Sequence, residues 1–137
     1  MTLEIARVII DFGAVVLIWM VQLIIYPSFV YYADKDLLKW HIPYTQRVTF
    51  IVAPIMFSQT GIIAYQTFTE FNYLNLLSAV ICSSLWFLTF FEAVPLHHKI
   101  DMNAKVQGTS KKLIHKNKKR TALWTVLFII SLTQLIR

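Results

Sequence analysis

The chain has 137 residues, of which 57% are hydrophobic and only 15% are charged. Soluble domains usually have about a quarter of their residues charged, so this composition argues against a soluble globular protein. Three glycines and four prolines leave little sequence for long loops or a second domain. One helical bundle within a membrane is therefore expected to use the whole chain.

Four apolar segments follow one another along the chain and predict an all-α bundle of four transmembrane helices. About 20 mostly apolar residues cross the hydrocarbon core of a bilayer, and the first three segments are long enough. The fourth is shorter, and its helix can extend back into the basic residues before it, whose long side chains reach the headgroups. The segments are residues 8–30, 48–68, 74–96 and 121–136, within a single domain of residues 1–137.

Prolines and short polar stretches indicate where the predicted helices begin and end. Pro27 closes the first segment, because proline lacks the N–H that continues a helix. Asp34 or Asp36 can cap a helix that leads into the second segment. Asn72 lies in a tight turn between the second and third segments, and Pro95 ends the third.

The positive charge lies mostly on one side of the predicted bundle. The connections after the first and third segments share a side, and with Arg47 they hold eleven of the 13 basic residues, eight of them in the basic loop 97–120. Arg7 and Arg137 lie opposite. By the positive-inside rule, the basic side is cytoplasmic and both termini lie on the non-cytoplasmic side.

The net charge of +6 does not indicate nucleic-acid binding. Most of the excess lies in one loop beside the membrane, where orientation and anionic lipid headgroups already account for it. We therefore expect the lipid bilayer, with anionic headgroups at the basic loop, to be the partner of these lysines. An acidic cytoplasmic partner remains an alternative.

Polar residues collect near the predicted cytoplasmic ends of the four segments. Ionisable groups inside a membrane are costly, so they are candidates for function by default. Gln22 and Tyr26 share a helix face at i, i+4 spacing. The candidate pocket, which would open towards the cytoplasm, consists of Gln22, Tyr26, His41, Tyr44, Arg47, Glu92, His97, His98, Asn117 and Arg120.

These residues suit a lipid headgroup, a quinone ring or an anion, and histidine and glutamate can also ligate a metal or haem. The adjacent His97 and His98 point about 100° apart on a helix, however, so they cannot both bind one small metal ion. No His-x-x-x-His or Glu-x-x-His spacing is present, so no preformed metal site is predicted. In a purely structural alternative, Glu92 pairs with Arg47 or Arg120. Asp11 is expected to be a helix-end group near the outer interface.

Several short patterns at these same positions resemble a largely uncharacterised family of small bacterial four-helix transmembrane proteins. The patterns are Trp19-x-x-Gln22-x-x-x-Tyr26-Pro27-x-Phe29, His41-x-x-Tyr44-x-x-Arg47, Val52-Ala53-Pro54-Ile55-Met56, Val94-Pro95-Leu96-His97-x-Lys99 and Asn117-x-x-Arg120-Thr121-x-x-Trp124. The resemblance implies the four-helix fold, this residue cluster and the bacterial inner membrane. The Val94-Pro95-Leu96 segment is more distantly similar to anthrone-oxygenase-like membrane proteins, which usually have asparagine in place of His97.

Three classes of function remain open at this point. The first is a membrane oxidoreductase or oxygenase that acts on a quinone-like apolar substrate, with Glu92 or His41 moving protons. The second is an accessory or scaffold subunit of a larger membrane complex. The third is a carrier or channel subunit that forms a homo-oligomer, with Asp11 or Glu92 facing the axis. All three place a ligand or a protein partner within or around one membrane bundle.

Overall fold

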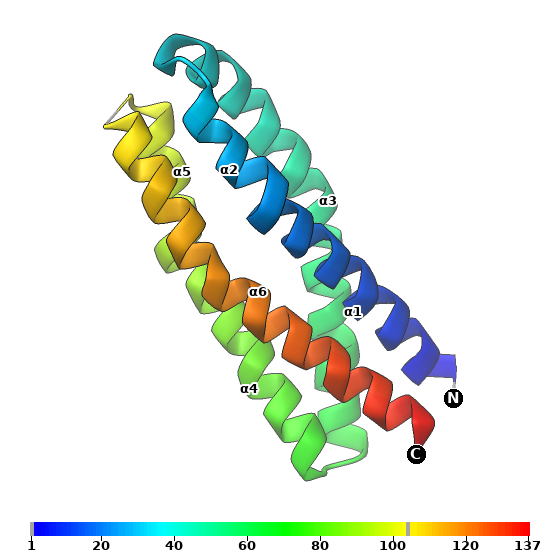
Figure 1. Cartoon of the computed structure of the whole chain (residues 1–137). Coiled ribbons are helices and arrows are strands. Elements are labelled where there is room, and N and C mark those ends of the chain that lie inside the picture. The colour runs from blue at the N-terminus through cyan, green and yellow to red at the C-terminus, as the bar shows by residue number, and fades with distance from the viewer. Residues whose placement is uncertain (1, 104) are drawn as a thin grey trace.

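The computed structural model describes residues 2–103 and 105–137, and it confirms the all-α four-helix bundle (Figure 1). Four helical rods, each long and apolar enough to cross a membrane, run side by side and alternate in direction. The chain is accordingly an integral membrane protein. The rods span Thr2–Tyr31, Asp34–Thr69, Tyr73–Asp101 and Val106–Ile136.

The first and third rods are each built from more than one helical piece, whereas the second and fourth are continuous α-helices. A π-helical turn, Val21–Ile25, follows α1, and a second, Thr89–Ala93, follows α4; a 3-10 turn, Phe29–Tyr31, ends the first rod. The α-helices are α1 (Thr2–Met20), α2 (Tyr26–Ser28), α3 (Asp34–Thr69), α4 (Tyr73–Leu88), α5 (Val94–Asp101) and α6 (Val106–Ile136).

The outside of the bundle is apolar, and the core contains both apolar and polar side chains. Large side chains such as Ile9, Phe50 and Phe68 are strongly exposed, as expected of a surface that faces lipid. The buried apolar core runs along the bundle axis and includes residues from every rod, among them Phe29, Leu37, Leu85, Leu113 and Leu127.

The basic stretch 97–120 is not the loop expected from its charge. Residues 97–101 complete α5, and the first half of α6 covers 106–120, which leaves a connection of only a few residues. Lysine and arginine are good helix formers, and apolar residues at helical spacing, such as Val106 and Leu113, are fully buried. The lysines therefore extend from an amphipathic helix, and the fourth rod is long enough to span the membrane.

One of the helix caps expected from the sequence forms in the structure, and another does not. The turn between α3 and α4 forms as expected, and the Asn72 side chain caps α4 by accepting a hydrogen bond from the N–H of Asn75. Asp34 and Asp36 do not cap α3: Ala33 occupies the cap position, and both aspartates lie in the first helical turn. They stabilise the helix there through the positive end of its dipole.

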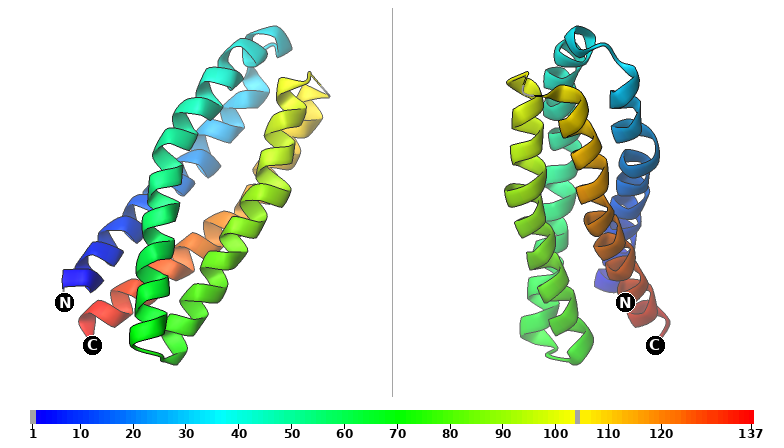
Figure 2. Two further views of the ribbon diagram at one scale, coloured as in Figure 1. Left: turned by 180° about the vertical axis from the view of Figure 1, so that it is seen from behind. Right: turned by 60° about the vertical axis from the view of Figure 1, so that its left-hand side comes forward.

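Both chain termini lie at the same end of the bundle (Figures 1 and 2).

Candidate functional site

A cavity of about 460 Å³ lies between α3 and the rod formed by α4 and α5, in the half of the bundle away from the termini. Figure 2 shows these two rods lying apart over this half. Most of the wall is apolar, and the cavity falls within the size range of small-molecule sites. The apolar wall includes Val48, Val52, Met56, Phe57, Trp86 and Phe90.

The lining of the cavity reaches the side of the bundle. Several lining residues are well exposed, and they come from two facing rods: Thr49 and Phe57 from α3, and Phe90 and Val94 from the π-helical turn and α5. A molecule entering between them would pass from the surface that faces the lipid tails. The lining also includes His98 and Asp101 towards the end of α5, and the expected opening towards the cytoplasm stays a prediction.

Buried polar groups line the inner end of the cavity. Tyr26, Tyr44 and Arg120 contribute to this wall, and each is less than a tenth exposed. The Tyr44 hydroxyl lies near that of Tyr26, but it has no hydrogen-bond partner of good geometry among the described residues. The Arg120 guanidinium faces Tyr26, and its Nε is likewise without a partner there. These polar atoms are packed against one another behind the inner wall and have almost no surface exposed to the cavity.

Four side chains from three helices form a continuous hydrogen-bonded chain along this wall, which we term the relay. The Tyr26 hydroxyl lies 2.9 Å from His97 Nε2, and His97 Nδ1 lies 2.9 Å from His41 Nε2. His41 Nδ1 in turn lies 2.6 Å from Asp101 Oδ1. His41 is fully buried, whereas the Asp101 side chain is 31% exposed. The relay thus joins a buried hydroxyl to a partly exposed carboxyl group, and both Tyr26 and Asp101 line the cavity.

When Asp101 is ionised, one set of tautomers satisfies every link of the relay. An ionised Asp101 can only accept, so His41 donates from Nδ1 and leaves its Nε2 as an acceptor. His97 then donates from Nδ1 to His41, and its Nε2 accepts from the Tyr26 hydroxyl. All three hydrogen bonds consequently point in the same direction, from the cavity towards Asp101.

Amide side chains hold Arg120 in place beside the relay. Asn117 Oδ1 accepts from Arg120 Nη1 at 3.1 Å, and Asn117 Nδ2 donates to Gln22 Oε1 at 3.1 Å. Gln22 also donates to the Ile114 backbone carbonyl. The Arg120 guanidinium lies 5.2 Å from the centre of the Trp124 ring, within range of a cation–π interaction. These contacts fix the cation at the inner end of the cavity.

The structure thus brings together seven of the ten residues in the sequence-based candidate pocket. Three of them belong to the relay: Tyr26, His41 and His97. Four lie beside it: Gln22, Tyr44, Asn117 and Arg120.

The three remaining candidates lie at the margin of the site or outside it. His98 reaches the cavity lining but is exposed, as expected from its angle to His97. Arg47 is exposed and lies over the Trp40 ring. Glu92 does not pair with either arginine but with Lys116 at 2.9 Å and Lys119 at 3.4 Å. The π-helical turn that contains Glu92 directs it towards the lysines of α6.

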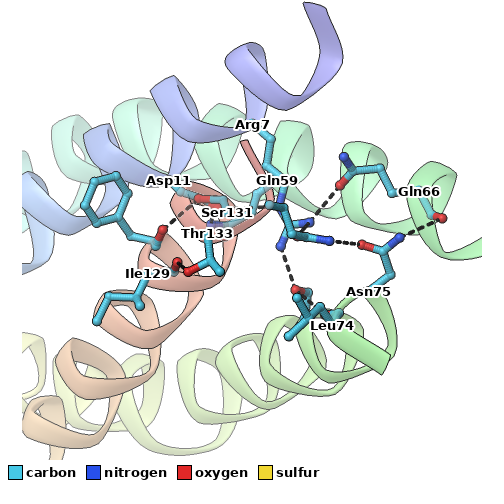
Figure 3. Close-up of polar contacts among 12 residues, drawn as sticks. Arg7, Asp11, Gln59, Gln66, Leu74, Asn75, Ile129, Ser131 and Thr133 are labelled. Carbon is cyan, nitrogen blue, oxygen red and sulfur yellow. Dashed lines mark hydrogen bonds and ion pairs between the residues drawn. The ribbon is translucent and has the colours of Figure 1, made fainter. Parts of the chain in front are cut away.

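A second polar cluster, near the termini, joins all four rods and contains a buried ion pair (Figure 3). Arg7 Nε lies 3.6 Å from Asp11 Oδ2, and both side chains are almost completely buried. The guanidinium of Arg7 donates to Gln66 at 2.7 Å, Gln134 at 2.8 Å and Ser78 at 2.6 Å. Asp11 is therefore not a helix-end group at the outer interface, since it lies in the bundle interior.

Amides extend this inter-helix network in both directions. Gln59 donates to Asp11 at 2.6 Å and accepts from the Trp124 indole at 3.1 Å. Gln134 donates to Asn75 at 2.7 Å. The sequence-based interpretation did not predict this cluster, although a signal existed. Arg7 and Asp11 stand at i, i+4 spacing, and Gln59 and Gln66 are seven residues apart, which places each pair on one helix face.

Metal binding receives no support from the geometry. Within residues 2–103 and 105–137, no group of three or more histidine, cysteine, aspartate or glutamate side chains could hold a metal ion. His41 and His97 point their ring nitrogens at one another and at their relay partners. Cys82, the sole cysteine of the sequence, is buried among apolar side chains near the Thr60 hydroxyl.

No protein-family model matches the chain, and no curated protein or solved structure matches it either. The fold and the cavity define a class of protein: a four-helix integral membrane protein with an apolar internal cavity that ends at buried hydroxyl, imidazole and guanidinium groups. The chemistry of that cavity is the basis for assigning a function.

Proposed function

We propose that this protein binds a lipid-soluble molecule with a ring that carries oxygen atoms, such as a quinone or a phenol. The observation that carries the proposal is the cavity itself, which is apolar over most of its wall and polar at its inner end. An apolar tail or ring suits Met56, Phe57 and Trp86, whereas a ring oxygen suits the hydroxyl of Tyr44 and the guanidinium of Arg120.

The unpartnered hydroxyl of Tyr44 supports a ligand with a polar atom at this end. A buried polar group without a hydrogen bond costs about 1–3 kcal/mol, so such groups usually have a partner in the functional state. Both atoms have almost no exposed surface, so a ligand oxygen satisfies them once the side chains of this wall move apart on binding. A purely aliphatic ligand would leave them unpaired, and we therefore favour a ring with oxygen substituents over a hydrocarbon.

The side opening supports access from the bilayer. Phe57 and Phe90 at the mouth belong to the surface that faces lipid, so an apolar molecule dissolved in the membrane reaches the cavity without crossing water. This route suits a quinone-like compound better than a water-soluble anion. An oxidoreductase or oxygenase acting on such a compound is a narrower version of the same proposal, and the distant similarity to anthrone-oxygenase-like proteins agrees with it.

A scaffold role within a larger membrane complex is the second candidate function. Stacked aromatic pairs on the outside of the third rod favour it, such as Phe87 and Phe91, whose ring centres lie 4.7 Å apart. A channel along an oligomer axis receives less support, because Asp11 is 1% exposed and is directed into the bundle of a single chain.

The proposed orientation places the cavity in the cytoplasmic half of a bacterial inner membrane, with both termini outside. The burial of Arg7 supports this orientation by the positive-inside rule. Arg7 lies in the bundle interior and is not a loop residue, so it does not add to the basic residues on the non-cytoplasmic side. Fusion of alkaline phosphatase to the C-terminus is expected to give an active enzyme, and fusion of green fluorescent protein a dark one. The reverse result would invert the orientation.

Native mass spectrometry of the protein, extracted gently from its host membrane, tests the proposed function. We expect an additional mass that differs from those of detergent and common phospholipids, and that is lost in the Ala53→Phe variant, whose new ring fills the cavity from α3. Ala122→Phe adds the same ring on the exposed face of α6 and is the matched control, which should retain the mass. Retention of the mass by Ala53→Phe, or a bare chain that travels with other polypeptides, would overturn the proposal.

A further inference from the structure

We infer that the relay transfers a proton from the bound ligand to the protein surface, so that the ligand is held as an oxyanion beside Arg120. The inference rests on the proposed function and extends it, because it narrows the ligand to a lipid-soluble weak acid, such as a phenol or an enol. It also assigns roles: Tyr26 accepts the proton, His97 and His41 pass it on, and Asp101 releases it.

The geometry of the relay suits proton transfer at every link. Each of its three hydrogen bonds is 2.9 Å or shorter, which is within the normal range for strong contacts. Tyr26 lines the cavity and is 3% exposed, whereas the Asp101 side chain is 31% exposed and can exchange its proton with water. The path therefore has one buried end, at Tyr26, and one partly exposed end, at Asp101, which also lines the cavity.

The transfer balances without any electron acceptor or donor. The O–H bond of the ligand breaks, and its proton joins the Tyr26 oxygen as the original Tyr26 proton moves to His97 Nε2. The Nδ1 proton of His97 moves to His41 Nε2, and the Nδ1 proton of His41 moves to Asp101, which releases it to water. One proton leaves the site, both imidazoles exchange tautomers, and one negative charge remains on the ligand oxygen.

Arg120 is placed to stabilise that charge. Its guanidinium faces the Tyr26 hydroxyl, is 7% exposed and has an Nε without a partner among the described residues. Asn117 holds one of its terminal nitrogens, which orients the cation towards the cavity. A preorganised cation in a site with little water stabilises an oxyanion much more strongly than bulk water would.

The composition of the relay distinguishes it from the structural contacts around it. The contact beside the relay, between Gln22 and Asn117, is made of amides. An amide cannot pass a proton along a chain, whereas a phenol, an imidazole and a carboxyl group can both take up and release one. A chain made only of such groups, with one buried end and one exposed end, is what proton transfer requires.

The proposal can be tested with a hexyl-substituted nitrophenol, a lipid-soluble weak acid whose anion is yellow. The purified protein in lipid nanodiscs is mixed with the probe in a stopped-flow instrument, in weak buffer with a pH-indicator dye. For the wild type we expect rapid appearance of the bound anion, release of one proton per bound probe, and slower formation in heavy water.

Two variants interrupt the relay while keeping its shape. Asp101→Asn still accepts the hydrogen bond from His41 but cannot take up a proton, and Tyr26→Phe keeps the ring but removes the first link. In both, we expect the bound anion to form about a hundredfold more slowly, the usual size of an acid–base contribution, when each variant is measured at a saturating probe concentration. Asp36→Asn, an exposed aspartate at the start of α3, is the matched control and should behave as the wild type.

The outcomes separate this inference from the proposed function. Binding by the wild type with unchanged rates in both relay variants would overturn the proton-transfer role and leave the binding function intact. Loss of binding in both variants, with no change in the rate of the bound fraction, would make the relay a structural brace and would also overturn the inference. If the wild type does not bind the probe, and native mass spectrometry also finds no bound molecule, both proposals fail.

Discussion

The buried ion pair between Arg7 and Asp11 allows a direct test of how the bundle is held together. Replacing Asp11 with leucine removes the carboxylate that lies 3.6 Å from Arg7 Nε and the acceptor of the 2.6 Å hydrogen bond from Gln59. Arg7 then keeps its three hydrogen bonds to neutral acceptors but loses its counter-charge. Arg7 is only 2% exposed. Neither water nor a lipid headgroup can therefore reach it to replace the lost negative charge unless the helix contacts open.

Removing one partner of a buried ion pair typically costs about 3–5 kcal/mol, and we expect Asp11→Leu to fall in this range. Removing both charges, in Arg7→Met combined with Asp11→Leu, also eliminates four hydrogen bonds between side chains. Each such bond between membrane helices contributes about 0.6 kcal/mol, so the double variant should lose about 2–3 kcal/mol. The sign is decisive: the double variant should be more stable than Asp11→Leu alone.

Unfolding in mixed micelles with increasing dodecyl sulfate, followed by circular dichroism, measures these differences in unfolding free energy. Asp36→Leu, which removes an exposed aspartate with the same change of side chain, is the control and should stay within about 0.5 kcal/mol of the wild type. The reasoning fails if Asp11→Leu unfolds within about 1 kcal/mol of the wild type, or if the double variant is less stable than the single one.

Three further predictions follow from individual contacts. Trp124→Phe leaves the buried Gln59 oxygen without its donor, so the unfolding free energy should fall by about 1–3 kcal/mol; an unchanged midpoint would contradict this. Glu92→Gln removes a partly exposed ion pair with Lys116, so the unfolding free energy should fall by at most about 1 kcal/mol and nitrophenol binding should be unchanged. Loss of binding would show that Glu92 belongs to the ligand site. Cys82, which is buried, should react with a maleimide only after unfolding, and rapid labelling of the native protein would show that this core is open.

The sequence alone was sufficient to predict the fold class and part of the candidate site. Hydrophobic segments of spanning length leave few alternatives to a helical bundle, and the structure has the four expected rods. Tyr26, His41, Tyr44 and Arg120 lie close together in the structure, as expected from their similar depth in the membrane. Depth is set by position along a helix, and a sequence reports that position directly.

Helix faces were harder to predict than depth. Glu92 and Tyr44 lie in the same half of the bundle, yet Glu92 contacts Lys116 near the surface while Tyr44 lines the cavity. The relay end at Asp101 was missed because this residue lies in a stretch assigned to a loop by its charge. Arg7 was missed because a lone arginine near a terminus is usually a solvated residue, and only its partners show that it is buried.

The two π-helical turns explain why helix faces could not be projected from a regular repeat. In each, a backbone N–H bonds five residues back instead of four: Tyr26 to the Val21 carbonyl, and Val94 to the Thr89 carbonyl. Proline follows one residue later in both rods, and its missing N–H removes the bond that would hold a regular α-turn.

A π-helical turn contains an additional residue, which rotates everything after it by about 100° relative to an unbroken α-helix. Tyr26 follows the first turn directly and His97 lies just after the second, and these two side chains meet at 2.9 Å. The irregularities of the first and third rods therefore converge on one hydrogen bond of the relay.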